Sequence, residues 1–283
     1  MGIVLGANRY GKAEVRMVHV DRSTPVHAIK DVNVTSRLFG DFTDTHVTGS
    51  NAAVIATDTQ KNTVYALART GGITTIEEYG WARIATSAGL DGEGGPHDHS
   101  FVRAGTETRT VAVAKHGAAE TVISGLADLT VLKSTGSEFW GFPDVEYTSL
   151  RETTDRILAT EVTARWRHLG SGADLDAVDW DTSFAGVRAT MLDHFAGTHS
   201  YSLQQTLYAM GRAVLEAHPG LAEIRFSMPN KHHFLVDLSA WGLDNPNEVW
   251  FAADRPYGLI EAAVVRDDVP ADDAAWAGIG GFV

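Results

Sequence analysis

Apolar and polar residues alternate along several stretches of the chain, which is the pattern of a half-buried β-strand. The pattern predicts strands over residues 13–20, 29–38, 107–117, 120–135, 156–168, 221–228, 233–239 and 258–266. Strands therefore lie in both halves of the sequence, at intervals short enough for antiparallel hairpins.

Helices are predicted between these strands. Phe184, Val187, Met191 and Phe195 recur at helical spacing within residues 181–197. A Ser or Thr followed three residues later by Gln or Glu, the spacing of a capping box, opens three further segments. These predicted helices cover residues 57–70, 74–89 and 202–220.

Each half thus reads strand, strand, helix, helix, strand, strand, which indicates a tandem repeat. We place the join near residues 137–150, with a first repeat over 1–140 and a second over 141–267. This order predicts an α+β fold with helices on one face of an antiparallel sheet. Oligomerisation could close the open sheet edges. Residues 268–283, acidic and rich in Gly and Ala, are expected to form a flexible tail.

Composition excludes several classes of function. The net charge of −13 over 283 residues argues against a sequence-independent grip on nucleic acid, and any anionic substrate must be captured by local cations. The absence of cysteine excludes disulfides, thiolate nucleophiles, iron–sulfur clusters and cysteine zinc sites. No apolar run is long enough for a transmembrane helix, so we expect no membrane association.

One candidate metal site is the cluster His97, Asp98 and His99, since an H-x-H pair on a strand directs both imidazoles to one face. The alternative is a polar loop after the glycine-rich stretch 90–96, and we favour it because spacing nominates no third ligand. The chain also lacks a P-loop, a strand-bound G-x-G-x-x-G and a G-x-S-x-G motif, which leaves no nucleotide or flavin signature.

Two other features have both an ordinary and a functional interpretation. Lys12, at a strand entrance, is either a solvated surface lysine or a reactive amine. Thr57 and Asp58 open a predicted helix, where Thr57 is expected to act as N-cap. A capped helix start also presents backbone N–H groups to an anion, so the two interpretations are compatible.

Six segments together resemble the urate oxidase (uricase) family, in the same order and at fitting intervals. They are RYGKAEVR, ATDTQKNTVYALA, LTVLKSTGSEFWGF, EYTSLRETTDR, SLQQTLY and MPNKHHF, between residues 9 and 234. The resemblance extends over nearly the whole chain and is most specific from Leu129 to Arg156.

The resemblance implies a T-fold, with two tandem repeats of antiparallel sheet and paired helices. It also implies subunits that pair into a sixteen-stranded barrel and a homotetramer with a tunnel, with active sites shared between subunits. The implied reaction consumes urate, O2 and water and gives 5-hydroxyisourate and hydrogen peroxide, with neither metal nor other cofactor. Deprotonated urate is itself the electron donor, and the protein moves protons, orients the reactants and stabilises charge.

The resemblance also assigns residues to the substrate. Phe139 corresponds to the aromatic platform, Arg156 and Gln204 to the pair that grips the pyrimidine edge, and Leu203 to a backbone N–H donor. Thr57 and Asp58 correspond to the contribution of the neighbouring subunit.

Three residues correspond to the family's proton relay, namely Lys12, Thr57 and His232. Asn230 corresponds to the residue over the ring face, where oxygen and then water lie. Because Thr57 and the pair Leu203–Gln204 both lie at helix starts in equivalent repeat positions, we hypothesise that two helix N-termini converge on one urate anion.

His233 departs from the family pattern, where we expect an aromatic residue such as Tyr, and strand alternation points it away from His232. The sequence ends in GGFV and not in a peroxisomal S-K-L signal, so a bacterial cytosolic protein is expected. The rival interpretations are another T-fold enzyme acting on a pterin or deazapurine, with zinc or a catalytic Cys, and a binding module without activity.

Overall fold

A computed structural model describes residues 4–70, 77–86, 95–116, 119–277 and 279–280. The chain forms two compact units, Met1–Thr110 and Val111–Val283. Hydrogen bonding joins the strands in sequence order, β1-β2-β3-β4 and β5-β6-β7-β8. The division of the chain falls within β4 and lies earlier than the join expected near 137–150, because β5 pairs with β6 of the second unit.

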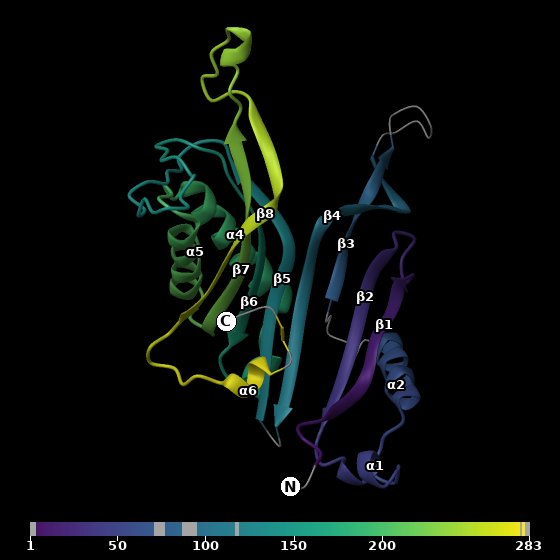
Figure 1. Cartoon of the computed structure of the whole chain (residues 1–283). Coiled ribbons are helices and arrows are strands. Elements are labelled where there is room, and N and C mark those ends of the chain that lie inside the picture. Colours follow the sequence, from purple (N-terminus) through teal and green to yellow (C-terminus); the bar gives the residue numbers. More distant parts are fainter. Residues whose placement is uncertain (1–3, 71–76, 87–94, 117–118, 278, 281–283) are drawn as a thin grey trace. The chain divides into compact units, whose positions relative to one another are not determined.

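The first unit is built from the elements β1 (Arg9–Asp21), β2 (Ala28–Phe39), α1 (Thr43–Val47), α2 (Thr57–Thr70), β3 (Glu77–Thr86) and most of β4 (Gly95–His116). Helix α2 packs along β1 and β2 (Figure 1). Its contact is a small apolar cluster in which Val15, Val32 and Val34 are buried and Met17 and Val64 are partly buried.

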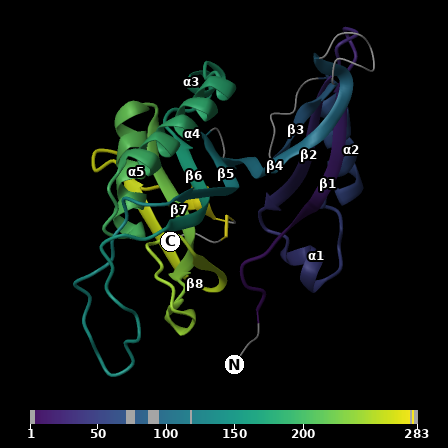
Figure 2. The same ribbon diagram turned by 90° about the horizontal axis from the view of Figure 1, so that it is seen from above.

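The second unit is built from β5 (Ala119–Lys133), β6 (Leu158–His168), α3 (Ala173–Asp176), α4 (Trp180–Gly197), α5 (Leu203–Ala217), β7 (Leu221–Leu235), the 3-10 turn η1 (Ser239–Trp241), β8 (Trp250–Val265) and α6 (Asp273–Trp276). Helices α4 and α5 cover one face of its strands (Figure 2). The apolar core lies between these layers and includes the fully buried Trp166, Met191, Leu207 and Phe226.

The first unit runs strand, strand, helix, helix, strand, strand, but with other members than predicted: the strand expected over 120–135 is β5 of the second unit, and the helix expected over 74–89 is wrong. This segment contains strand β3, which pairs with β2 through Asp31↔Tyr79 and with β4 through Glu78↔Arg109. The capping-box spacing involves only four residues. Hydrogen bonding of this segment to a strand on each side stabilises the extended conformation more than the capping box would stabilise a helix. Helix α1 takes the place of the second helix in the first unit.

The tail expected to be flexible is instead packed as far as α6. Trp276 is buried, and its Nε1–H donates to Oε1 of Glu223 at 2.8 Å. Glu223 also accepts from Nε of Arg167 at 2.7 Å, while the Arg225 guanidinium lies 4.0 Å from the Trp276 ring centroid. The contacts with this buried ionic group hold α6 in place, although composition predicts a flexible tail there.

Gly211 sets the distance between α5 and the sheet. An added Cβ would lie 2.6 Å from Cγ2 of Val264 and 3.1 Å from Cε2 of Phe226.

Gly211→Ala gains helix propensity of about 1 kcal/mol, but overpacking costs about 1–3 kcal/mol. We therefore expect a lower free energy of unfolding, measured by urea denaturation at fixed protein concentration. Gly197→Ala in α4, where nothing lies within 4 Å of the added Cβ, is the matched control and should leave stability equal or higher. Equal stabilisation by both substitutions would contradict this packing argument.

His168 makes stability depend on pH. Its side chain is 5% exposed, Nε2 lies 2.9 Å from Oγ of Ser124, and burial lowers its pKa from 6.5 to about 4. Between these values the unfolded chain binds the proton and the folded chain does not, so stability falls as pH drops from 6.5 to 4. The loss from this group is at most about 3 kcal/mol. Urea midpoints of His168→Asn should fall less steeply over this window than those of the unmodified chain; equal slopes would show that His168 is not the cause.

Candidate functional site

The candidate residues of the first unit lie where β1 meets the start of α2. Lys12 is half-buried on β1, opposite Ser36 of β2. The Ser36 hydroxyl donates to Oε1 of Gln60 in α2 at 2.7 Å, and the Tyr10 hydroxyl accepts from the Ile55 N–H at 2.8 Å. These two bonds hold the helix start beside the strand that carries Lys12.

A β-bulge follows Lys12 immediately. Pairing shifts register between Lys12 and Val15, and Glu14 has a φ of 54°, in the left-handed region. At Gly11 an added Cβ would lie 1.9 Å from the Ser36 carbonyl oxygen, so only glycine permits this approach of the strands. The bulge bends β1 next to the lysine, as bulges at strand ends often do.

The start of α2 differs from the predicted capping box. The Ala56 carbonyl accepts from the Gln60 N–H at 3.2 Å, so Thr57 is the first helical residue and not the N-cap. The Gln60 side chain bonds Ser36 and the Ile55 carbonyl instead of reaching back to close the box. Thr57 is consequently exposed at the first helical position, with the positive end of the helix dipole behind it.

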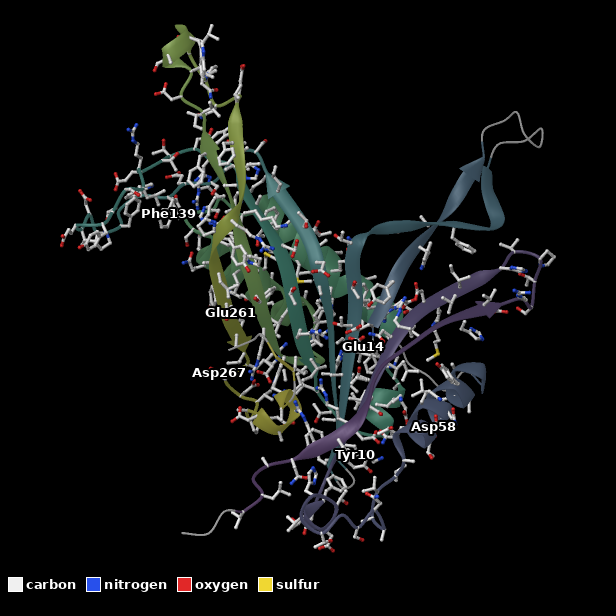
Figure 3. The ribbon with its side chains drawn as sticks, turned by 45° about the vertical axis from the view of Figure 1, so that its right-hand side comes forward. Tyr10, Glu14, Asp58, Phe139, Glu261 and Asp267 are labelled. Atoms are coloured by element: carbon white, nitrogen blue, oxygen red, sulfur yellow. The ribbon has the colours of Figure 1, made fainter. Side chains whose placement is uncertain are left out.

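Asp58 is exposed beside Thr57, and Figure 3 shows it in the same unit as Tyr10. A hydrogen bond and the charge of Lys61 lower the pKa of Asp58, with a smaller contribution from the charge of Lys12. Lys12 therefore lies near enough to this helix start for its charge to act on Asp58.

In the second unit, the segment after β5 is clamped between two others. Ser137 forms a parallel bridge with Ser200, and its carbonyl accepts from the Arg156 N–H at 3.0 Å. Phe139 exchanges two backbone hydrogen bonds with Thr153, of 2.8 and 2.9 Å. This pairing brings Phe139, Arg156 and the chain leading into α5 together, although more than 40 residues separate the last two.

Phe139 and Arg156 form one face of the candidate site. Cζ of Arg156 lies 5.1 Å from the Phe139 ring centroid, and Phe139 stacks on Phe142 with centroids 5.1 Å apart. Figure 3 shows Phe139 in the connection between β5 and β6. Burial lowers the pKa of Arg156, and among the described residues no carboxylate forms an ion pair with it. The guanidinium thus presents a charge that no acidic side chain neutralises there.

Helix α5 begins beside this pair, as predicted. Oγ of Ser202 accepts from the Gln205 N–H at 3.1 Å, and Oε1 of Gln205 accepts from the Tyr201 N–H at 2.8 Å. The predicted capping pair is therefore present, with its return bond one residue further back. Leu203 is buried in the first turn, and Gln204 next to it is exposed.

Strand β7 supplies the two remaining candidates. Asn230 pairs with Thr160 of β6 and with Gly258 of β8, and a register shift separates it from His232. Burial lowers the pKa of His232, and the charges of Arg156 and His233 lower it further. His232 is therefore neutral at lower pH than an ordinary histidine and can accept a proton there.

His233 makes a local contact, in agreement with the structural role expected for it. Its Nδ1 lies 3.0 Å from the Lys231 carbonyl oxygen. Lys231 in turn pairs with Glu161 of β6 at 2.7 Å, whereas Arg156 has no such carboxylate partner in the described part of the chain.

The candidates thus fall into two groups, one in each unit: Lys12, Thr57 and Asp58 in the first, and Phe139, Arg156, Leu203, Gln204, Asn230 and His232 in the second. The second group offers an aromatic face, a cation, a helix start and a neutral imidazole, which suits a flat anionic heterocycle. Ser137, which bonds the Arg156 side chain, lies within one of the six segments, but no role was assigned to it from the sequence.

Two further sequence-based points concern metals and membranes. Among the described residues no three His, Asp or Glu side chains are grouped so as to hold a metal ion, while the side chains of His97, Asp98 and His99 lie outside the described part. No helix in the described part of the chain is long and apolar enough to span a membrane.

Comparisons with known proteins identify the family of this chain. The Uricase family model matches residues 8–114 and 122–261. The chain is 53% identical to a uricase of Arthrobacter globiformis over 99% of its own length and 96% of that protein. It is 35% identical to the uricase of Aspergillus flavus, over 93% of its own length and 97% of that protein.

Solved structures give the same result. The crystal structure of the Arthrobacter globiformis uricase matches with a TM-score of 0.89 and 50% identity, over 98% of this chain and all of that one. A urate oxidase from Bacillus sp. TB-90 matches with a TM-score of 0.74 over 92% of this chain and all of that one; at 22% identity it supports the fold alone.

The family resemblance seen in the six motifs is therefore confirmed over nearly the full length of the sequence and in the fold. This chain belongs to the uricase family, and it is a urate oxidase of the bacterial type.

Proposed function

We propose that this chain oxidises urate with O2 and water to 5-hydroxyisourate and hydrogen peroxide, without metal or flavin. The observation that carries the proposal is Arg156, an unneutralised and half-buried cation set 5.1 Å from the face of Phe139. Membership in the family supports the substrate. The two electrons that reduce O2 to peroxide come from urate, water supplies the hydroxyl added to the ring, and the peroxide leaves with two protons.

In this proposal urate stacks on Phe139, and its pyrimidine edge meets Arg156 and Gln204. A planar guanidinium can donate two parallel hydrogen bonds to a carbonyl and an anionic nitrogen, while the glutamine amide offers one donor and one acceptor. The Leu203 N–H, in the first turn of α5, donates to a substrate carbonyl. These contacts fix the plane of the ring and favour its anion.

Lys12, Thr57 and His232 are proposed to remove protons from urate and return them to peroxide. The neutral state of His232 favours this role, since burial lowers the pKa of the histidine and the charge of Arg156 lowers it further. Each proton removed raises the electron density of the ring, and stepwise electron transfer then avoids the spin barrier to triplet O2. Asn230 is proposed to orient O2, and later water, over the ring.

We further propose that each site is shared between subunits of a homotetramer built from tandem T-fold repeats around a tunnel. The two groups of candidates lie in different units, and α2 and α5 hold equivalent places in the repeated order. In the proposed site their N-termini, one from each subunit, converge on one urate. Two positive helix ends would offset part of the net charge of −13.

The direct test follows urate absorbance and peroxide formation together, with and without a chelator. We expect one peroxide for each urate consumed and no effect of the chelator. Failure to consume urate would refute the proposed function. Chelator-sensitive turnover would instead point to a metal-dependent T-fold enzyme.

Substitutions separate proton transfer from binding. Lys12→Ala and His232→Ala should lower kcat by about 10²-fold or more, because each removes a group that moves protons in the transition state. Arg156→Ala should chiefly raise the dissociation constant for urate, measured without oxygen. His233→Ala is the matched control for His232→Ala and should retain kcat within about threefold. An unchanged kcat in the His232 variant would exclude it from the relay.

Mixing two impaired variants tests whether subunits share the site. If Lys12 and Arg156 serve one site from different chains, hetero-oligomers of Lys12→Ala and Arg156→Ala contain some sites with both residues intact. At a urate concentration well below the raised dissociation constant of Arg156→Ala, dissociating and reassembling the two variants together should therefore raise activity above that of either variant treated alone. Absence of recovery in verified hetero-oligomers would place both residues in sites formed by a single chain.

A further inference from the structure

We propose that Ser137 is a positioning residue for Arg156, whose hydroxyl orients the guanidinium without neutralising it. The inference rests on the proposed function, because it explains how the cation is presented to the urate edge. The motifs assign a role to Phe139 and Arg156 but none to Ser137, which lies two residues before the aromatic platform.

Ser137 holds both the backbone and the side chain of Arg156. Its carbonyl accepts from the Arg156 N–H at 3.0 Å, and its Oγ accepts from Nε–H at 3.2 Å. The side chain of Ser137 is fully buried, so water has little access to the hydroxyl that accepts this bond. With Nε–H engaged by Ser137, the edge of the planar guanidinium that the two terminal nitrogens form remains available for an anion.

The chemical type of this partner matters as much as its position. A carboxylate at residue 137 would also hold the arginine but would neutralise it, and a urate anion would then have to compete with that charge. A hydroxyl has no net charge, so it fixes the plane of the guanidinium and leaves the attraction for an anion intact. It equally preserves the positive field that lowers the pKa of His232.

The surrounding backbone has independent supports, so the role of the hydroxyl can be isolated. Asp155 accepts from Oγ1 of Thr135 at 2.8 Å and from Nδ2 of Asn247 at 3.3 Å, and its carbonyl accepts from Oγ1 of Thr153 at 2.7 Å. Replacing Ser137 by Ala keeps the backbone bond to Arg156. The substitution therefore removes the side-chain contact and leaves the segment anchored.

Ser200 provides the matched control. It is also fully buried and forms the other half of the bridge with Ser137, but its hydroxyl bonds the Ser202 carbonyl and Thr206 and does not contact Arg156. Ser200→Ala thus removes a buried hydroxyl from the same bridge without touching the guanidinium.

The experiment measures urate binding without oxygen, followed by kcat and KM in air. Ser137→Ala should weaken binding about tenfold while kcat changes less than about threefold, since a charge-assisted hydrogen bond that orients the ground state is lost. Ser200→Ala should leave the dissociation constant within about twofold. Unchanged binding in Ser137→Ala, or equal weakening in both variants, overturns the inference. Ser137→Cys, which keeps the side-chain volume but accepts hydrogen bonds weakly, should weaken binding as well and serves if alanine impairs folding.

A substrate-free measurement separates this inference from the proposed function. Exchange of the Arg156 Nε proton with water, followed by NMR in protein labelled at arginine nitrogen, should be faster in Ser137→Ala and unchanged in Ser200→Ala. An unchanged rate in Ser137→Ala overturns the positioning role even if urate proves to be the substrate. If the unmodified protein fails to consume urate, the proposed function falls, and the exchange rates still decide the role of Ser137.

Discussion

The short parallel bridge between Ser137 and Ser200 is the contact on which the candidate site of the second unit depends. It joins the chain leaving β5 to the chain entering α5, and the Ser137 carbonyl extends it to Arg156 at the entrance of β6. Both serines are fully buried, where an unpaired backbone group costs as much as a lost hydrogen bond. Breaking the bridge would leave buried backbone groups unpaired. Its hydrogen bonds therefore fix Phe139, Arg156 and the start of α5 relative to one another.

The candidate site also shows how a protein with a negative net charge can present a positive charge to an anion. Nearby carboxylates already have partners: Glu138 bonds Trp140 and His199, Glu161 pairs with Lys231, and Asp155 bonds Thr135. Arg156 is held by a neutral hydroxyl instead. Its charge is then available to bind an anion, and it adds to the effect of burial, which is the main cause of the lowered pKa of His232.

Sequence patterns predicted those parts of the fold that local signals determine. The helices near 181–197 and 202–220 and the strand near 156–168 are confirmed, because their apolar spacing matches the faces buried in the core. The strands predicted separately over 221–228 and 233–239 are instead one strand, β7, which ends at Leu235. The error over 74–89 arose because Thr75 and Glu78 mimic a capping box, while pairing of β3 with β2 and β4 is a long-range property. Ser137 could not be found for the same reason, since its importance comes from Arg156, 19 residues away.

The N-termini of α2 and α5 are built differently, and this difference matters for the proposed site, in which each comes from a different subunit. At α5, Ser202 and Gln205 cap the helix, and buried Leu203 ties the first turn to the core. At α2, Thr57 is exposed, and the turn is tied to the strands through Gln60, which bonds Ser36, and through Ile55, whose N–H bonds Tyr10. A helix end directed toward solvent in one chain can meet a ligand held by another chain without any rearrangement of its own fold. In the proposed assembly the second unit therefore supplies a preformed surface for the ring, and the exposed start of α2 supplies the part that arrives with a neighbouring subunit.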